Sequence, residues 1–358
     1  MTDTPRLWIR HETLPTERRA PITPADAGRL VADGFVVTVE DCEQRVFPTS
    51  DYAAAGCRIV AQGSWPDAPD DSYIIGLEEP GPEPRALRHR HVFFGHAYKG
   101  QTTGLQLLRR FAAGGGSLLD LEHLTYTDGR RVAAFGFWAG YVGASLAVLH
   151  SRGRLTSPLQ PLSKQELDSE LVQSRGDSSQ ALVIGALGQC GSGARAALFK
   201  ADIAATCWDV KETRQLDWQT LLDHDIVINT VLATEAASAF LEPADFNHPN
   251  RRLSVVSDVR CDVTSHGNLL PAYDQPTQWH QPVRRLHEGR PPLDRIAVDN
   301  LPLLLPREAS TDFSADLLPH LRSLATWSPP WQRCLHAFHA ASTADTTIME
   351  EAKAVASR

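Results

Sequence analysis

A run of apolar residues enters a glycine-rich segment at residues 181–193, where Gly185, Gly188 and Gly191 recur at intervals of three. Such glycines let the backbone turn tightly and approach a pyrophosphate, whose charge is met by N–H groups at the start of the next helix. Asp209 follows about twenty residues later, where a carboxylate can hold the ribose hydroxyls and disfavour a 2′-phosphate. Tight turns also select glycine, and the spacing departs from Gly-x-Gly-x-x-Gly, but together these features predict a site for NAD.

A histidine at position 96 comes just after the apolar segment 91–94, close to Lys99 and Gln101. Open α/β sheets bind ligands where their strands end. An imidazole titrates near neutral pH and can therefore donate or accept a proton during hydride transfer. A lone histidine is usually structural, but this position favours an acid/base role for His96.

Basic residues elsewhere could bind the anionic parts of a ligand. Arg130 and Arg131 stand at the expected start of a long helix, and paired guanidinium groups suit pyrophosphate and carboxylate, although exposed arginine pairs are usually solvated. Two further candidates stay open. Glu122 either touches the site or only pairs with a neighbouring base, and Arg19 is either a second carboxylate clamp or a surface charge.

The composition of the 358 residues favours two globular domains that bind small molecules. The formal net charge is −8 and the basic residues are scattered, so no nucleic-acid surface is indicated. The six cysteines show no Cys-x-x-Cys spacing, so we expect reduced, mostly buried thiols and no metal site. The amino terminus lacks the apolar stretch of a signal peptide, so we expect a cytoplasmic protein.

The segment 132–149 is uncharged, apolar and about as long as a membrane span. It could be a transmembrane helix, which its Gly136-x-x-x-Gly140 pattern would suit, or a long helix buried between two domains. Alanine and glycine dominate the segment, and no other segment suggests a membrane. We therefore expect a helix that is buried on all sides.

Strand-like and helix-like segments alternate along the chain, which is typical of parallel sheets. Strands are expected at residues 7–10, 35–40, 58–61, 73–77, 91–94, 117–119, 181–184, 205–208, 226–229 and 253–257. Helices are expected at residues 23–33, 52–55, 103–113, 132–149 and 192–200. Residues 155–179 are expected to be a surface excursion.

Several longer motifs resemble the NAD-dependent, lysine-forming saccharopine dehydrogenase family, a relative of alanine dehydrogenase. They stand at residues 10–13, 120–122, 129–137, 185–193, 250–253 and 304–310, and span nearly the whole chain. The resemblance implies an α/β fold with two Rossmann-like domains, whose parallel sheets flank an interdomain active-site cleft. The expected domains are residues 1–136 with 306–345 and residues 137–305, followed by a flexible tail at 346–358. Relatives imply a monomer or a small homo-oligomer.

The resemblance also implies a reaction and roles for individual residues. Family members oxidise the secondary amine of saccharopine to an imine, which water hydrolyses to lysine and 2-oxoglutarate. His96 is implied as the general acid/base, and substrate contacts are implied for Arg19, Gln101, Arg131 and Phe135. Contacts with NAD are implied for Arg130, Gly188, Gln189, Asp209, Thr213, Val259, Val298, Asp299, Asn300 and Leu301.

The chain departs from the family at the catalytic lysine. The family has Gly-Leu-Lys-Glu where this chain has Gly-Leu-Glu-Glu, so that Glu78 stands in the lysine's place. A carboxylate could still accept a proton there, but it inverts the local charge and should weaken carboxylate binding nearby. Glu78 is therefore expected to be a catalytic residue with an altered partner.

Further departures lie in the second half of the chain. A substrate-contacting Ser-Ala-Asp segment reads Arg260-Cys261-Asp262 here, and Leu232 replaces a tyrosine on the nucleotide side. The lost cation at position 78 and the gained cation at position 260 suggest an exchanged ion pair. The family's disulfide partner of Cys190 is also replaced, by a threonine.

A changed substrate accounts for these departures better than loss of activity does, because the glycine loop, Asp209, His96 and Arg131 are retained. We expect an NAD-dependent oxidoreductase that acts on a CH–NH bond of saccharopine or of a related opine-like or lysine-derived adduct. Its partners would be amino-acid and oxoacid substrates. An NAD-binding homologue with little or no activity is the alternative, and a deaminase like alanine dehydrogenase is a third.

Overall fold

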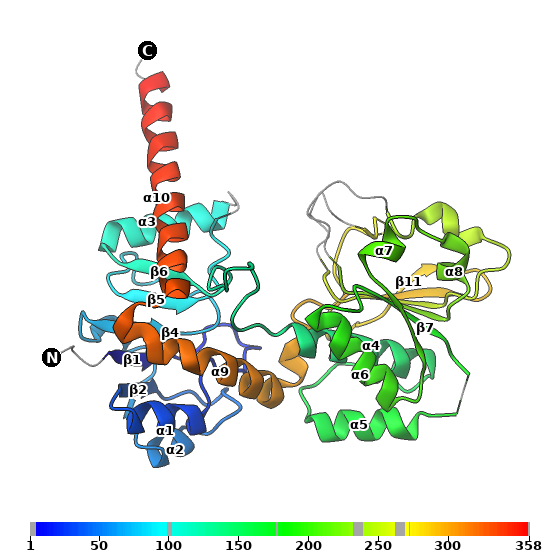
Figure 1. The fold of residues 1–358 in the computed structure, drawn as a ribbon, viewed down its shortest axis with the longest axis horizontal. Helices are drawn as coiled ribbons and strands as arrows, with labels where there is room; N and C mark the ends of the chain where they lie inside the picture. The colour runs from blue at the N-terminus through cyan, green and yellow to red at the C-terminus, as the bar shows by residue number, and fades with distance from the viewer. Residues whose placement is uncertain are drawn as a thin grey trace. The chain divides into compact units, whose positions relative to one another are not determined.

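The computed structural model describes residues 5–98, 102–176, 178–231, 239–261, 269–271 and 273–356, with only the backbone of Thr102 and of residues 344–356. The chain divides into two compact units (Figure 1). Unit 1 comprises Met1–Ala134 and Ala309–Arg358. Unit 2 comprises Phe135–Glu308.

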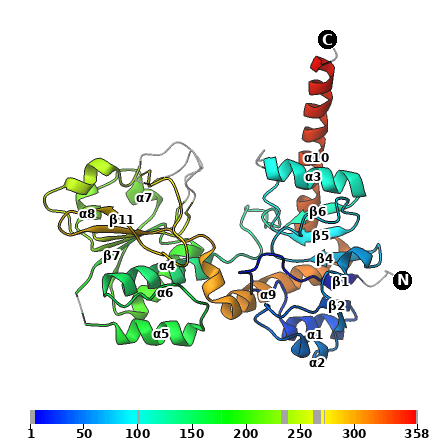
Figure 2. The same ribbon diagram turned by 180° about the vertical axis from the view of Figure 1, so that it is seen from behind.

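The described part of unit 1 contains a six-stranded parallel sheet with the strand order β3-β2-β1-β4-β5-β6. The strands are β1 (Arg6–Ile9), β2 (Val36–Glu40), β3 (Arg58–Val60), β4 (Ser72–Ile75), β5 (Arg90–Phe93) and β6 (Ser117–Asp120). The helices are α1 (Pro24–Ala32), α2 (Thr49–Ala54), α3 (Thr102–Gly114), α10 (Pro329–Ala356) and α9 (Pro306–Arg322), whose first three residues belong to unit 2, with 3₁₀ turns η1 (Trp65–Asp67) and η4 (Ser323–Thr326). Helices α1 and α2 pack near β2 and β3, whereas α3 and α10 lie near β6 (Figures 1 and 2).

The described part of unit 2 contains a second six-stranded sheet, in the order β11-β12-β10-β9-β7-β8. Only the pair β11–β12 in this sheet is antiparallel. The strands are β7 (Ala181–Ile184), β8 (Ala205–Trp208), β9 (Ile226–Asn229), β10 (Val255–Asp258), β11 (Arg284–His287) and β12 (Leu293–Ile296). The helices are α4 (Gly136–Ser151), α5 (Lys164–Gln173), α6 (Gln189–Lys200), α7 (Val210–Thr213) and α8 (Trp218–Leu222), with 3₁₀ turns η2 (Pro243–Asn247) and η3 (Leu301–Leu304).

Local sequence explains the start of α1 and the burial of two strands. Thr23 caps α1 by accepting a hydrogen bond from the backbone N–H of Asp26, and Pro24 occupies the first helical turn. Strands β4 and β7 are buried along their whole length, as expected for parallel strands that are covered on both faces. The predicted α/β fold is confirmed, and its sheets are parallel as predicted except for the pair β11–β12.

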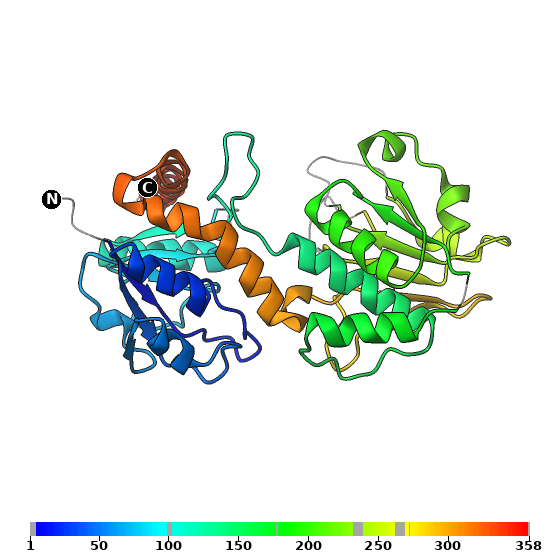
Figure 3. The ribbon, with the colours of Figure 1, turned by 60° about the horizontal axis from the view of Figure 1, so that its bottom comes forward.

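The apolar segment that resembled a membrane span forms α4, which is buried inside unit 2. It packs along α6 and against β9 and β10. Helices α4 and α6 are labelled next to each other in Figure 1 and lie among the green helices in Figure 3. A Cβ atom on Gly140 would lie 1.8 Å from the carbonyl oxygen of Cys190, and one on Gly193 would lie 1.9 Å from that of Phe137. Glycine is therefore required on both helices. No helix in the described ranges combines the length and the hydropathy that a membrane crossing requires.

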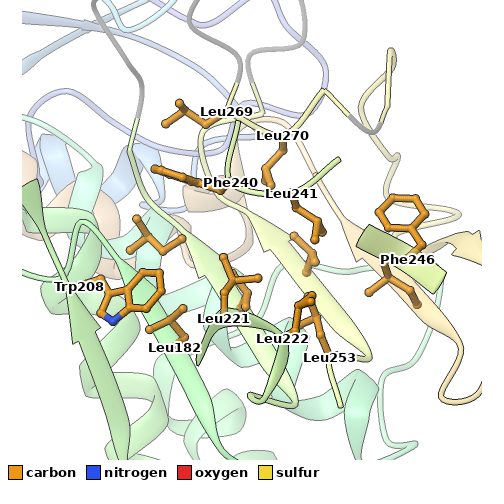
Figure 4. Close-up of a cluster of buried hydrophobic side chains, with 14 residues drawn as sticks. Leu182, Trp208, Leu221, Leu222, Phe240, Leu241, Phe246, Leu253, Leu269 and Leu270 are labelled. Atoms are coloured by element: carbon orange, nitrogen blue, oxygen red, sulfur yellow. The ribbon is translucent and has the colours of Figure 1, made fainter. Parts of the chain in front are cut away.

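The opposite face of the unit 2 sheet is covered by an apolar cluster (Figure 4). Leu182 and Ile184 of β7 contribute to it from the sheet, and Leu221 and Leu222 contribute from α8. Trp208 at the end of β8 belongs to the same cluster. The core therefore fixes the strand that precedes the glycine loop and the strand that ends just before Asp209.

The structure contains elements that the sequence predictions lacked. The predicted surface excursion 155–179 contains α5, which begins at a capping box formed by Ser163 and Glu166. Strands β11 and β12 were not predicted. Helix α10 continues to Ala356, and the flexible tail at residues 346–358 stays a prediction.

Candidate active site

Polar residues follow four neighbouring strands of unit 1 at the same edge of the sheet. Strands β1, β4, β5 and β6 are adjacent and parallel, so their carboxyl ends meet at one edge. Within three residues of these ends stand Glu12, Glu78, His96 and Glu122. This edge is where open parallel sheets bind ligands.

His96 and Glu122 contact each other at this edge. Phe93 and Asp120 are register partners on β5 and β6, so the residues that follow them emerge side by side. Nδ1 of His96 lies 3.3 Å from Oε2 of Glu122, and the histidine side chain is 60% exposed. The hydrogen bond to Glu122 raises the pKa of His96, and this effect outweighs partial burial, which lowers it. His96 is thus an accessible imidazole that retains its proton above the ordinary histidine pKa.

Glu122 also binds a cation. Its Oε1 accepts a hydrogen bond of 2.8 Å from Nη2 of Arg131, whose side chain is 43% exposed. Its own backbone N–H donates to Asp120 at 2.9 Å. The two alternatives for Glu122 are therefore not exclusive, because the carboxylate pairs with Arg131 and lies beside His96.

Glu78 lies beside Arg19 in the same unit. Nη2 of Arg19 is 3.4 Å from Oε1 of Glu78, and the Glu78 side chain is 26% exposed. Burial raises the pKa of Glu78, Arg19 opposes this effect, and the carboxylates of Glu17 and Glu12 add to it. Glu78 is therefore a carboxylate that holds a proton more readily than usual. The exchanged pair with Arg260 stays a prediction.

Arg19 is not a surface charge, because it is only 3% exposed. Its Nε donates to Oε1 of Glu17 at 2.9 Å, and its Nη2 lies 2.5 Å from Oε2 of the same residue. A fork-to-fork pair of this kind holds the guanidinium in one orientation. Glu17 was missed by sequence reasoning, although it stands two residues before Arg19.

Arg130 and Arg131 do not begin a helix, which corrects our prediction. They belong to a turn in which Thr125 and Arg131 form an isolated antiparallel bridge, and α4 begins only at Gly136. Arg130 is paired at 2.7 Å with Asp128 and is 76% exposed. The prediction failed because the apolar character that starts at residue 132 precedes the helix by one turn.

The glycine loop of unit 2 has the form of a dinucleotide cradle. Gly185 follows β7 with φ of +81°, and a Cβ atom on it would lie 2.5 Å from Cγ2 of Val231. A Cβ atom on Gly191 would lie 2.2 Å from the carbonyl oxygen of Gly185. Gly188 is the N-cap of α6 and supplies no side-chain cap, so the first turn of the helix faces the loop with backbone N–H groups. These residues fit a pyrophosphate.

Asp209 ties the second strand to this loop. Its Oδ2 accepts a hydrogen bond of 3.0 Å from the backbone N–H of Leu187, and its Oδ1 accepts one of 2.9 Å from that of Val210. Thr213 donates through Oγ1 to the Asp209 carbonyl oxygen at 3.0 Å. The carboxylate therefore lies beside the glycine loop, where the ribose of a dinucleotide would be.

Other predicted nucleotide residues follow neighbouring strands of the same sheet. Val259 comes directly after β10, and its N–H donates to the Asn229 carbonyl oxygen at 3.0 Å. Residues 298–301 follow β12, and Asn300 has a left-handed φ of +54°. Cys261 donates through Sγ to the Ala297 carbonyl oxygen at 2.9 Å, and the Arg260 N–H donates to Asp258 at 3.3 Å.

Four predicted residues lie outside the described part of the chain: Lys99, Gln101, Leu232 and Asp262.

Comparisons with solved structures show the same fold. An L-alanine dehydrogenase superposes with a TM-score of 0.69 at 17% identity, covering 93% of both chains. A transhydrogenase from Sinorhizobium meliloti superposes with a TM-score of 0.63 at 16% identity, covering 89% of this chain and 94% of the other. A family model described as the N-terminal domain of alanine dehydrogenase and PNT matches residues 8–142.

Curated relatives match over nearly the whole length. The saccharopine dehydrogenase [NAD(+), L-lysine-forming] of Emericella nidulans is 40% identical over 349 residues, which are 89% of this chain and 92% of the relative. The enzyme of the same name from Neurospora crassa is 39% identical over 354 residues, covering 93% and 95%. With the glycine cradle of unit 2 and the strand-end residues of unit 1 in place, the chain belongs to the family of NAD-dependent, lysine-forming saccharopine dehydrogenases.

Proposed function

We propose that this protein is an NAD-dependent oxidoreductase that breaks or forms the secondary C–N bond of saccharopine or of a related opine-like or lysine-derived adduct. The observation that carries the proposal is the accessible His96 held by Glu122 beside Arg131. The glycine cradle and Asp209 support NAD as the cofactor. Homology to enzymes named for saccharopine supports the substrate class.

Bound NAD would supply the acceptor for a hydride from the carbon next to the substrate nitrogen. Gly188, Gln189 and the first turn of α6 would hold its pyrophosphate, and Asp209 would hold the adenosine ribose. A carboxylate at the ribose position disfavours a 2′-phosphate, which supports NAD over NADP.

His96 would move the protons that follow. Nδ1 of the ring faces Glu122, which leaves Nε2 to exchange a proton with the substrate. Loss of hydride from the neutral secondary amine gives a protonated imine, and water adds to its carbon. The C–N bond then breaks as the added oxygen forms a carbonyl group and the protonated nitrogen leaves as an amine. A base must take a proton from the water and an acid must give one to the nitrogen, and an imidazole can do both.

Glu78 and Arg131 would have two further roles in this reaction, proton acceptance and substrate binding. The carboxylate of Glu78 has a raised pKa and would accept the proton that the secondary amine releases before hydride transfer. Arg131 keeps part of its guanidinium exposed and would pair with a substrate carboxylate. A carboxylate at position 78 supports a substrate that differs from saccharopine in the charge facing this position.

The proposal is tested by following NADH absorbance at saturating cofactor. NADH should form with saccharopine or an opine-like amine, or disappear when amines and 2-oxo acids are added together. The His96→Gln variant should lose turnover and keep NADH binding measured by fluorescence titration. NADH binding without turnover, both with the amines and with the mixtures of amines and 2-oxo acids, would contradict the proposal. The protein would then be an NAD-binding homologue without activity.

Turnover of saccharopine at ordinary enzymatic rates would show that Glu78 does not redirect specificity. A Glu78→Gln variant separates the roles of the two candidate proton carriers. It should slow the amine-dependent step and leave NADH binding unchanged. Unchanged kcat in this variant would remove Glu78 from the mechanism.

A further inference from the structure

A buried ion pair contacts the backbone of Glu78. Arg10 and Glu12 follow β1, are 1% and 5% exposed, and face each other with Nη1 of Arg10 3.2 Å from Oε2 of Glu12. Removing two charges from water is costly, and their attraction alone rarely compensates for the cost. A pair buried in this way needs further hydrogen bonds, and these bonds identify what the pair holds.

Nη1 of Arg10 also donates to the carbonyl oxygen of His11 at 2.8 Å, and three further hydrogen bonds of the pair go to the backbone of the loop after β4. Oε1 of Glu12 accepts a hydrogen bond of 2.7 Å from the N–H of Leu77, and Oε2 accepts one of 3.2 Å from the N–H of Glu78. Nη2 of Arg10 donates to the carbonyl oxygen of Glu78. Both polar backbone atoms of Glu78 are therefore bound by the pair, so its backbone position is set by two buried charges.

The surroundings of Arg10 are shaped to admit its guanidinium. A Cβ atom on Gly76 would lie 2.5 Å from Cζ of Arg10, so any larger residue at position 76 would displace the guanidinium. On another side, Cζ of Arg10 lies 5.9 Å from the centroid of the Phe93 ring. A glycine at position 76 is thus what lets the charge reach the carbonyl oxygen of Glu78.

The same loop is joined to the strand that leads to His96. The Gly76 N–H donates to the Val92 carbonyl oxygen at 3.0 Å, and the Phe94 N–H donates to the Leu77 carbonyl oxygen at 3.0 Å. Residues 76–78 are thereby fixed to the end of β1 by the ion pair. They are fixed to the end of β5 by these two backbone hydrogen bonds. The separation of the Glu78 and His96 backbones is defined from both sides.

We propose that Arg10 and Glu12 are positioning residues that place Glu78 for its part in the C–N reaction. This proposal rests on the function proposed above. Neither residue would touch the substrate, because both are buried. Their effect on turnover would pass through the backbone of residues 77 and 78.

The decisive variants perturb the pair in different ways. Glu12→Gln removes its charge and one acceptor, Arg10→Lys keeps the charge and loses the forked donor, and Gly76→Ala displaces the guanidinium without changing any charge. Asp26→Asn is the matched control, because Asp26 is a buried carboxylate of the same unit that binds Thr23, Arg29 and Ser314 away from the loop.

Hydrogen exchange of the full-length protein reports the positioning without any substrate. The amides of Leu77 and Glu78 should exchange about ten-fold faster in Glu12→Gln, since a hydrogen-bonded acceptor is lost. They should keep wild-type protection in Asp26→Asn. Wild-type protection in Glu12→Gln, Arg10→Lys and Gly76→Ala would overturn the proposal even if the protein had no measurable turnover.

NADH formation from saccharopine, or from the opine-like amine that the wild type oxidises, reports the consequence for catalysis. We expect kcat to fall by about ten- to a hundred-fold in Glu12→Gln and Gly76→Ala, the cost of a misplaced catalytic group, with a smaller change in KM. In Glu12→Gln a negative charge next to Glu78 is gone, which should lower the pKa of Glu78. The limb of the kcat/KM profile that reports Glu78 should therefore move to lower pH. Gly76→Ala should lower kcat while keeping that charge.

Two results separate the two proposals. Wild-type kcat in Glu12→Gln and Gly76→Ala, together with an unmoved pH limb in Glu12→Gln and an active wild type, would overturn the positioning role and leave the proposed function intact. An inactive wild type with lost amide protection in the variants would overturn the proposed function and leave the placement of Glu78 by the pair supported. If Glu12→Gln does not fold, Gly76→Ala and Arg10→Lys decide the question.

Discussion

The carboxylate of Glu122 lies 3.3 Å from Nδ1 of His96, so that one carboxylate orients the imidazole and raises its pKa. The partner is supplied by the neighbouring strand β6, whose carboxyl end meets that of β5. A histidine oriented through one ring nitrogen has its other nitrogen available for proton transfer.

We predict that Glu122→Gln lowers the pKa of His96 towards its ordinary value of 6.5, because the charged hydrogen-bond partner is lost. The limb of the kcat/KM profile that reports His96 should move to lower pH, and kcat should fall. Steady-state rates across pH 5 to 9 measure both effects. An unmoved limb would show that another group controls it.

We predict that Asp209→Asn weakens NADH binding by about ten-fold, the loss of a charge-assisted hydrogen bond, and reduces the preference over NADPH. Fluorescence titration with both cofactors measures the change in Kd. Asp217→Asn is the control, because Asp217 also caps a helix through the Thr220 N–H, at 3.1 Å. Equal loss of affinity in both variants would point to a general effect on the fold.

We predict opposite outcomes for two alanine substitutions in the glycine loop. Gly188→Ala has room for its Cβ, whose nearest neighbour is 3.6 Å away, and should fold normally but bind NADH weakly. Gly191→Ala places its Cβ 2.2 Å from the Gly185 carbonyl oxygen and should cost about 1–3 kcal/mol of stability. Thermal unfolding and NADH titration distinguish the two, and normal NADH affinity in Gly188→Ala would remove the loop from the cofactor site.

We predict that Glu40 stabilises the fold at neutral pH and that this contribution is lost in acid. Burial alone would raise its pKa, but hydrogen bonds from His11, Gly63 and Trp8 bring the pKa below the ordinary value of 4.5. A pKa lowered by folding stabilises the fold above that value, and the contribution is lost as pH falls through the lowered value.

Glu40→Gln should therefore be less stable than the wild type at pH 7 by about 1–3 kcal/mol, the cost of buried donors left without an acceptor. The difference should shrink as pH falls below 4.5. Urea unfolding at several pH values measures it. A difference that stays constant with pH would show that the charge of Glu40 makes no contribution.

Local patterns in the sequence were sufficient for the elements that carry the cofactor prediction. Buried β7, the turn at Gly185 and the uncapped start of α6 are set by residues that are neighbours in sequence. The capping box of α5 was equally readable, but the polar composition of residues 155–179 hid it. Strands β11 and β12 were missed because neither has an apolar pattern: β11 carries Arg284 and Arg285, and β12 carries Asp294 and Arg295.

The sequence by itself determined the α/β class, the glycine loop with Asp209, and the charged or titratable side chains that follow the strands, because these depend on short-range geometry and composition. Only the tertiary structure decided which of those side chains meet. Parallel register placed Glu122 beside His96 and brought Arg10 and Glu12 beneath Glu78, across 66 to 68 residues of chain. Such contacts depend on strand order and register, which no local pattern specifies.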